Sequence, residues 1–276
     1  MRRTAWTVGL GLSALGGVAL AQAYTFEVNR YERELPGLRA PLRVVQLSDL
    51  HYGAYIGRGS VRAWVDAARA LRPDVVLVTG DFVDRRGVAP LEPLFEELSR
   101  LRAPLGVWGV WGNHDVAHFR QVAHREGKSA EEARDAFEGN LRRAGLRILR
   151  NEGVTLREDV FLAGVDDLRR GEARLEAALA HAPDQGAVLL MSHNPDLLPE
   201  VPERVGLTLC GHTHGGQVCL PLVGPLLTSS RHGRRFASGL VRGPAPGFVS
   251  RGLGVTTVPF RLSCRPEVVV LDLVPG

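Results

Sequence analysis

The sequence feature best suited to chemistry is a pair of histidines flanked by glycines, in Cys210-Gly211-His212-Thr213-His214-Gly215-Gly216. It directly follows the apolar run from Val205 to Leu209. Side chains at positions i and i+2 of an extended chain project to the same side, so the two imidazoles can face one ligand. The glycines allow the backbone to turn sharply and to approach that ligand closely. The segment is therefore suited to holding a ligand at the end of a strand.

Four upstream segments share this design, because each is an apolar run that ends in polar residues able to bind metal. They are Asp49-Leu50-His51, Gly80-Asp81-Phe82-Val83-Asp84, Gly112-Asn113-His114-Asp115 and Ser192-His193-Asn194. Five of the nine histidines of the chain lie in these segments or in the first one. Any one of them alone would be read as a turn or a strand end, but five in series indicate a shared site.

The donor atoms in these segments are carboxylate, imidazole and amide groups, with no thiolate. This mixture suits Mn, Fe, Zn or Co better than Ca or Mg, which prefer shells made only of oxygen. The ligands are too many for one ion. Two ions about 3.5–4 Å apart need a bridging carboxylate, and Asp81, a short side chain on a glycine turn, fits that position.

Apolar periodicity predicts an alternation of strands and helices that would position these segments. Strands are expected at 42–47, 74–79, 106–111, 147–149, 160–165, 187–191, 248–250, 255–258 and 267–273. Helices are expected from residue 60, at 91–101, from residue 129 to about residue 145, and at 172–180. The third helix opens with a capping box formed by Ser129 and Glu132. Such alternation predicts an open α/β sheet, in which ligands bind outside the carboxyl ends of the strands. The five segments can therefore converge on one edge. Residues 42–276 are expected to form one domain.

In this order, the five segments resemble the calcineurin-like metallophosphoesterases, and the resemblance extends from about Leu42 to Leu273. It implies an α/β fold, a four-layer α/β/β/α sandwich of two facing mixed sheets flanked by helices. It also implies two divalent transition-metal ions, Mn, Fe or Zn, and in-line attack on phosphorus.

The resemblance also assigns roles to residues. One metal would be held by Asp49, His51, Asp81 and His214, and the other by Asp81, Asn113, His193 and His212. His114 would be the catalytic acid that protonates the leaving oxygen, and Asp84 would orient it.

A narrower resemblance rests on Gly-His-Thr-His-Gly-Gly-Gln, Ser250 to Gly254 and Arg265-Pro266-Glu267. These residues are similar to a bacterial branch with exported or membrane-anchored members. That branch includes phosphodiesterases and is related to enzymes that cleave UDP-2,3-diacylglucosamine. The resemblance favours a phosphodiester or pyrophosphate substrate, with a lipid-linked or envelope molecule as one form of it. Arg251 could bind a substrate phosphate, but a solvated arginine of a hairpin is an equal interpretation.

Other functions remain as alternatives. A phosphomonoesterase or a nuclease could share the fold, but the formal charge is only +4 and no basic groove interleaved with aromatic residues is visible, so no nucleic acid is expected as partner. A non-catalytic metal-binding scaffold is disfavoured because no ligand is missing, and the same ligand set disfavours a membrane-tethered structural protein. Three irregularly spaced cysteines indicate neither disulfides nor a thiolate site.

The N-terminus predicts export. Arg2 and Arg3 precede an uncharged apolar stretch, and the roughly 21 residues from Thr4 would span about 31 Å as a helix, enough for a bilayer core. Ala21-Gln22-Ala23 alternatively fits the cleavage site of a signal peptide, and the arginine pair allows the twin-arginine route. We expect residues 1–26 to be a signal peptide or a membrane anchor, residues 27–41 to be a linker, and the catalytic domain to lie outside the cytoplasm, exported or membrane-associated.

Overall fold

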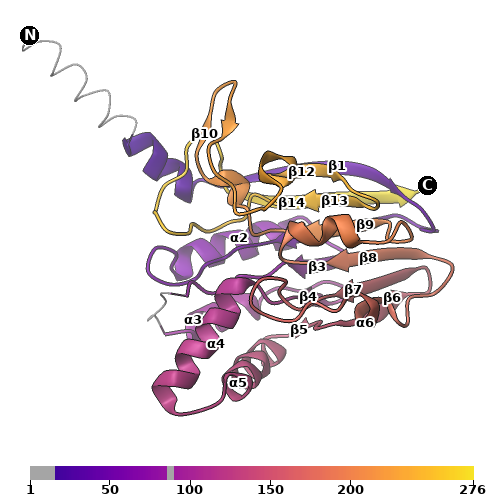
Figure 1. Ribbon diagram of the computed structural model, residues 1–276, viewed down its shortest axis with the longest axis horizontal. Helices are drawn as coiled ribbons and strands as arrows, with labels where there is room; N and C mark the ends of the chain where they lie inside the picture. Colours follow the sequence, from indigo (N-terminus) through magenta and orange to yellow (C-terminus); the bar gives the residue numbers. More distant parts are fainter. Residues whose placement is uncertain (1–15, 86–89) are drawn as a thin grey trace, which may run out of the picture.

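Two six-stranded sheets lie face to face in the protein, with helices on the outside (Figure 1). The computed structural model describes residues 16–85 and 90–276. Three apolar cores separate the layers. The first lies between the sheets, the second between sheet 1 and the helices beside it, and the third between sheet 2 and its own short helices. This is the four-layer α/β/β/α sandwich that the sequence predicts.

Sheet 1 contains the strands that carry three of the five polar segments. Its order is β1-β14-β2-β3-β4-β5, with β1 (Glu27–Leu35), β14 (Glu267–Pro275), β2 (Leu42–Leu47), β3 (Val75–Val78), β4 (Val107–Gly109) and β5 (Leu146–Ile148). The strands β2 to β5 are parallel, and β14 runs antiparallel to β2. All four residues of β3, Val-Val-Leu-Val, are buried, as expected of a strand covered on both faces.

Sheet 2 carries the other two polar segments. Its order is β12-β13-β9-β8-β7-β6, with β12 (Gly239–Arg242), β13 (Pro246–Val249), β9 (Leu207–Cys210), β8 (Ala187–Met191), β7 (Val160–Gly164) and β6 (Glu152–Arg157). The four central strands are parallel to one another, and the two edge strands are antiparallel to their neighbours. A separate two-stranded hairpin is formed by β10 (Cys219–Leu220) and β11 (Gly224–Pro225).

The helices bury one face each. The elements are α2 (Arg58–Ala70), α3 (Glu92–Leu98), α4 (Asn113–Glu126), α5 (Ala130–Arg143), α6 (Leu175–Leu179) and the 3-10 helices η1 (Pro195–Glu200), η2 (His214–Gly216) and η3 (Gly233–Phe236). The apolar stripe predicted for the helix near residue 60 is confirmed, since Val61, Trp64 and Ala68 of α2 are buried. The predicted capping box of α5 is also confirmed, because the Ser129 side chain accepts a hydrogen bond from the backbone of Glu132 and the Glu132 carboxylate accepts one from the backbone of Ser129.

Two predicted segments differ in the structure. The prediction of a linker over residues 27–41 is wrong for β1, which pairs in parallel with β14 along its whole length. Exposed and half-buried residues alternate along it, as on an edge strand, and the sequence pattern hides this because both sets contain charged residues and no long apolar run results. The strand expected at 255–258 is a loop, whose Thr256 backbone exchanges hydrogen bonds with the side chain of Gln217.

Only part of the predicted signal peptide or anchor can be placed. Residues 1–15 lie outside the described residues, and residues 16–24 are helical. Across the described ranges, 16–85 and 90–276, no helix has the length and apolar character needed to cross a bilayer. Ala23 is buried in the core beside sheet 1, and the carbonyl of Ala19 accepts a hydrogen bond from the backbone of Arg261.

Candidate active site

The carboxyl ends of β2, β3, β4, β8 and β9 bring the five polar segments together, as their parallel direction requires. One cluster joins β2 to the histidine pair after β9. His51 Nε2 lies 3.0 Å from His214 Nε2, and His214 Nε2 lies 3.3 Å from Asp49 Oδ1. All three side chains are buried. Three ligands predicted for the first metal therefore converge.

A second cluster shares the carboxylate of Asp81. Its Oδ2 lies 3.4 Å from His51 Nε2 and 3.3 Å from His193 Nε2, so one oxygen faces both clusters. His193 Nε2 also lies 3.3 Å from Asn113 Oδ1 and 3.2 Å from His212 Nδ1. Asp81 therefore lies between the two clusters, where a carboxylate could face two ions.

The backbone at the site is strained. Asp49, His51, Asp81, His212 and His214 all have positive φ, between 47° and 71°. Residues with a Cβ pay roughly 1–3 kcal/mol for such a conformation, and they keep it where the surrounding structure enforces it. Five predicted ligands share this strain, which indicates that the fold is held in the conformation that points them inward.

Two glycines allow the segments to approach one another. A Cβ on Gly211 would collide with Ser48 Oγ and Asp49 Oδ2, and a Cβ on Gly112 would collide with Asp81 Oδ1. Glycine is therefore required at these two positions by the close contact of one strand end with the next.

Hydrogen bonds orient the ligand atoms. The Nδ1 atom of His193 lies 2.8 Å from the carbonyl oxygen of Thr79, to which it can donate, and this leaves Nε2 with a free lone pair. The backbone N–H of His212 donates to the carboxylate of Asp49, and that of His114 donates to Asp81 Oδ1. Each buried carboxylate is thereby fixed while one oxygen remains turned toward the histidines.

The charges of the cluster suit cations. Burial opposes ionisation of Asp49 and Asp81, yet the neighbouring histidines hold the pKa of both carboxyls below the usual range. Burial lowers the pKa of His212 to about 4 and that of His214 well below its usual value. Burial also opposes charge on His193, but Asp81 and Asp49 raise its pKa well above normal. Two ionised carboxylates beside the neutral imidazoles of His212 and His214 form a donor set that fits divalent transition metals.

The predicted acid lies at the rim of this cluster. His114 Nδ1 lies 3.4 Å from Asp84 Oδ1, and the ring of His114 packs edge-on against His51 with centroids 4.5 Å apart. Burial disfavours the charged ring, but the carboxylates of Asp81 and Asp84 raise the pKa of His114 above its usual value. The neighbouring carboxylates therefore favour the protonated ring, whose Nδ1 lies beside Asp84.

A pocket of about 240 Å³ opens above these groups. It is lined by Asp81, Asp84, Arg85, Asn113, His114, Arg169, Arg170, His212, His214, Ser229, Thr256 and Thr257. The three arginines were not predicted from the sequence. The signal for two of them was Asp166-Asp167 after β7, because Asp167 Oδ2 accepts hydrogen bonds from the backbone N–H groups of Arg169 and Arg170 and so shapes the turn that carries them.

Arg251 does not line this pocket, although the sequence offered it as a phosphate ligand. Its guanidinium donates to Glu27 Oε1 at 2.6 Å and to Glu267 Oε2 at 2.8 Å, and its side chain is only 22% exposed. The structure thus places it among two carboxylates, where it ties β1 to the start of β14.

Sequence reasoning also missed Arg261, which has no exposed surface. Its guanidinium lies 3.1 Å from His214 Nδ1 and donates to the backbone carbonyls of Arg251, Gly252 and Gly254. Arg261 therefore fixes the ring of His214 and joins two loops of the site, and its position in the loop before β14 carries no motif that could have revealed this.

The comparison with known families agrees with this geometry. Residues 42–216 match the calcineurin-like phosphoesterase family. The chain belongs to this family. It is a metallophosphoesterase, a hydrolase with a cluster of histidines and aspartates that resembles a dimetal site.

Three similar proteins show how far the similarity extends. The uncharacterized metallophosphoesterase YkuE of Bacillus subtilis is 30% identical over 84% of this chain and 78% of its own length. The phosphodiesterase YaeI of Escherichia coli is 30% identical over 85% of this chain and 83% of its own. The UDP-2,3-diacylglucosamine pyrophosphatase LpxG of Chlamydia trachomatis is 26% identical over 77% of this chain and 78% of its own.

Proposed function

We propose that the protein is a dinuclear metallophosphoesterase that hydrolyses a phosphodiester or pyrophosphate bond, in a lipid-linked or envelope substrate such as UDP-2,3-diacylglucosamine. The observation that carries the proposal is the pocket itself. The buried carboxylate of Asp81 and the ring of His114 line one part of it, here called the floor, and three arginines, of which Arg85 and Arg169 are exposed, line the part here called the rim. A related phosphodiesterase and a related UDP-2,3-diacylglucosamine pyrophosphatase support the choice of substrate class.

The predicted ligand set fits two divalent ions, one between Asp49, His51, Asp81 and His214 and one between Asp81, Asn113, His193 and His212. When bound, such ions would neutralise charge on the phosphoryl group and activate the attacking water. The donor chemistry is compatible with Mn, Fe or Zn.

His114 then supplies the proton. The proton sits on the ring nitrogen that faces the pocket and passes to the leaving oxygen as its bond to phosphorus breaks. Asp84 holds the opposite nitrogen, which fixes the ring orientation and stabilises its positive charge. Asn113 contributes its amide oxygen beside His193 on the same floor.

The arginines of the rim favour a substrate with a second anionic group. A phosphoryl group at the metal centre needs no further cation there, whereas the second phosphate of a pyrophosphate extends away from the floor. Arg169 and Arg170 are carried on one turn that lines the pocket, so their guanidiniums can bind this second phosphate as charge-assisted hydrogen-bond donors.

An activity screen tests this assignment. The Mn-loaded protein is assayed against bis-nitrophenyl phosphate, nitrophenyl phosphate and a UDP-linked lipid. We expect the diester and the pyrophosphate to be turned over faster than the monoester. Arg169→Gln and Arg170→Gln should raise KM for the pyrophosphate substrate roughly tenfold or more and change the single-phosphate diester less. Arg174→Gln, in the same loop but outside the pocket, is the matched control. Preference for the monoester would overturn the proposal.

We also propose that the enzyme acts outside the cytoplasm, held at or exported through the membrane by its N-terminal segment. Two arginines followed by an uncharged stretch support this location. Protease added to intact spheroplasts should degrade the folded domain, while a cytoplasmic marker survives. Protection of the domain until lysis would place it in the cytoplasm and contradict the proposal.

A further inference from the structure

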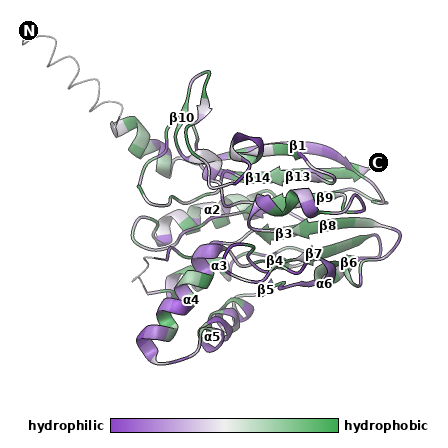
Figure 2. Cartoon of the chain, viewed as in Figure 1, coloured by the Kyte–Doolittle hydropathy of each residue, from purple (hydrophilic) through white to green (hydrophobic). Residues whose placement is uncertain are grey.

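The β10–β11 hairpin exposes a group of apolar side chains that the fold leaves uncovered. Leu222 at its turn is fully exposed, Leu227 is 81% exposed, and Val223 and Leu226 are exposed to about half. The two strands form a two-stranded sheet of their own and belong to neither large sheet. Figure 1 shows the hairpin projecting from the body, and Figure 2 shows hydrophobic residues at its tip. We call residues 218–228 the apolar hairpin.

The apolar hairpin lies on the same side as the helical residues 16–24. One short segment, residues 260–263, binds both of them. The backbone of Cys219 donates to the carbonyl of Leu262, and the backbone of Arg261 donates to the carbonyl of Ala19. Three more apolar side chains are exposed on this side. The exposed fractions of Val18, Leu20 and Phe260 lie between 38% and 49%. Isolated exposed leucines are common on proteins, but a projecting group of this size marks an interaction surface.

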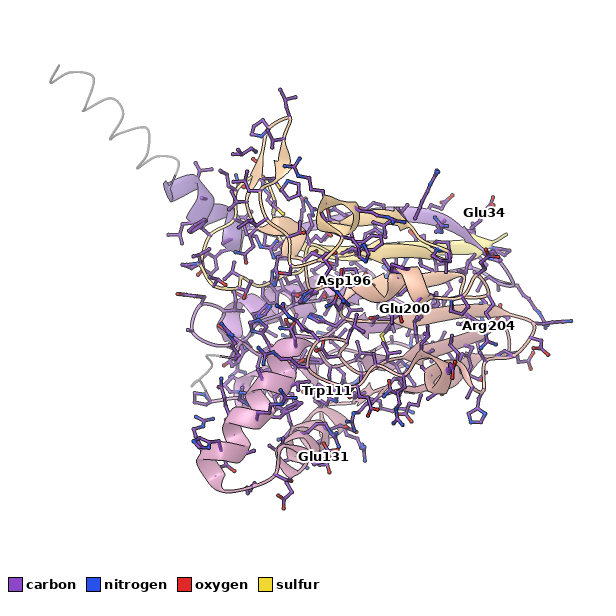
Figure 3. The ribbon with its side chains drawn as sticks, viewed as in Figure 1. Glu34, Trp111, Glu131, Asp196, Glu200 and Arg204 are labelled. Carbon is purple, nitrogen blue, oxygen red and sulfur yellow. The ribbon has the colours of Figure 1, made fainter. Side chains whose placement is uncertain are left out.

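The charges around the apolar hairpin select an anionic partner. Between Glu203 and Glu267 the chain contains eight arginines and no acidic residue or lysine, and of these Arg251 is paired with two carboxylates and Arg261 is buried. Arg231, Arg234 and Arg235 follow the hairpin directly and are exposed. Asp196, labelled in Figure 3, accepts hydrogen bonds from the Ser230 hydroxyl and the Arg231 backbone, and so fixes the chain where it leaves the hairpin.

We propose that the apolar hairpin inserts its tip into the surface of an anionic lipid bilayer, with the arginines behind it contacting the headgroups. Apolar side chains at a projecting tip backed by cations match an interface that is apolar inside and negatively charged at its surface. The cores of protein–protein interfaces are depleted of charged residues, so an apolar tip followed by three exposed arginines fits a lipid surface better.

The position of the apolar hairpin gives this docking a consequence for the enzyme. The hairpin begins directly after η2, which contains His214, and Ser229 at its far end lines the active-site pocket. Insertion of the tip would therefore hold the mouth of the pocket next to the headgroup layer. The docking itself does not depend on which phosphoester is cleaved, since lipid alone is enough to test it.

Fluorescence at the hairpin tip tests insertion in the full chain. Leu222→Trp is compared with Leu240→Trp, at an exposed leucine of β12 in sheet 2. Spectra of the parent, which has four tryptophans, are subtracted. With vesicles of phosphatidylglycerol and phosphatidylcholine, we expect the Leu222→Trp emission to shift to the blue and to be quenched by brominated acyl chains. Leu240→Trp should show neither effect.

The charge contribution is tested with paired variants. Arg234→Gln together with Arg235→Gln in the Leu222→Trp background should weaken the quenching several-fold in anionic vesicles, and 0.5 M salt should have a similar effect. Arg142→Gln, an exposed arginine of α5, removes charge elsewhere and should change little. Replacing Leu222 and Leu227 by aspartate should abolish insertion while bis-nitrophenyl phosphate turnover stays unchanged, which shows that the fold and the site survive.

Two results would overturn the proposal. In the first, the Leu222→Trp variant sediments with vesicles but its emission stays that of an exposed tryptophan. The protein would then bind the membrane through its N-terminal segment and not through the hairpin. The second is a blue shift without lipid that grows with protein concentration and accompanies dimers in sedimentation equilibrium. In that case the hairpin binds a second copy of the chain. Failure of the pyrophosphatase assignment would leave these lipid measurements unaffected.

Discussion

At the scale of single residues, the proton on His114 gives the sharpest test of the chemistry. His114→Ala should keep most of its bound metal, because the predicted ligands remain, and should slow turnover by about 10²–10⁴-fold. The slowing should be smaller for nitrophenyl esters than for alkyl esters, since good leaving groups need little protonation. Steady-state kinetics over a series of leaving groups measures this difference.

Two comparisons separate the acid from the ligands. Asp81→Ala should lose both metal content and rate, because its carboxylate lies between the two clusters. Equal slowing of nitrophenyl and alkyl esters in His114→Ala would show that the ring does not donate the proton. Elemental analysis of each variant measures its metal content. Together with the kinetics, it distinguishes loss of the proton donor from loss of metal.

Arg261 gives a second prediction at this scale. Replacement by methionine keeps much of the apolar stem but removes the donors that bind His214 Nδ1 and five backbone carbonyls, including that of His214 itself. Partners of metal-binding histidines typically contribute 10- to 100-fold to metal affinity. We therefore expect Arg261→Met to bind Mn about 10- to 100-fold more weakly in equilibrium titrations. Arg265→Met, at an exposed arginine four residues later, is the matched control, and equal affinity in both variants would contradict the positioning role.

The predicted ligands could be found from the sequence because metal chemistry restricts residue type. Histidine and aspartate at the ends of apolar runs are uncommon enough to be read together, and the structure does bring them together. Arg169 and Arg261 could not be found in this way. An arginine has no fixed spacing to a phosphate or a carbonyl, and only the folded chain shows which of the many arginines is buried or lines the pocket.

At the scale of elements, Glu97 joins α3 to α2. Its side chain is 1% exposed and binds Arg58, Arg62 and Arg100. Hydrogen bonds from Arg62, with those from Arg100 and Arg58, overcome the effect of burial and lower the pKa of Glu97 to about 2. Because the folded-state pKa lies below the unfolded one, the resulting stability is present above about pH 4.5 and is lost as the pH falls toward 2.

We therefore expect Glu97→Gln to reduce the free energy of unfolding by about 1–2 kcal/mol at pH 7, since its partners are partly exposed and screened. The difference from the parent should narrow between pH 5 and pH 2. Urea unfolding at several pH values measures it. Glu96→Gln removes a neighbour that is 58% exposed and pairs with Arg58 at the surface, and should cost less. A penalty for Glu97→Gln that is independent of pH would show that the charge is not its source.

The elements that could be predicted are those with one apolar face. The strand from Leu42 to Leu47 is found at the predicted residues, and α2 buries the predicted stripe. The elements that were missed lack such a pattern. β1 lies at a sheet edge and contains charged residues at both its exposed and its half-buried positions. α4 begins at Asn113, inside a segment whose polar residues indicate a metal site. In β1, exposure to solvent hides the apolar periodicity of a strand, and in α4 the residues of the site hide that of a helix.

At the scale of the whole molecule, part of the N-terminal segment that the sequence predicts to be a signal peptide or an anchor contacts the fold. Ala23 is buried, and Ala19 and Gln22 accept hydrogen bonds from Arg261 and Ser263. Removing residues 1–15 should leave both the melting temperature and turnover of soluble esters nearly unchanged. Removing residues 1–26 should lower the melting temperature, by roughly 2–4 °C for each kcal/mol of lost contact. Differential scanning fluorimetry compares the two, and equal melting temperatures would show that residues 16–26 add no stability.

The order of strands in sheet 1 also determines when this sheet can be completed during translation. β14 lies between β1 and β2, so the first two strands to leave a ribosome become neighbours of the last one. Asn29 and its partner Glu267 are 238 residues apart, which corresponds to a delay of roughly 10–50 s at ordinary translation rates. During that interval the edge of β2 that β14 will cover has no strand to pair with. The nascent chain therefore stays incompletely folded until translation is almost finished, and a chaperone or an export factor has that interval in which to bind it.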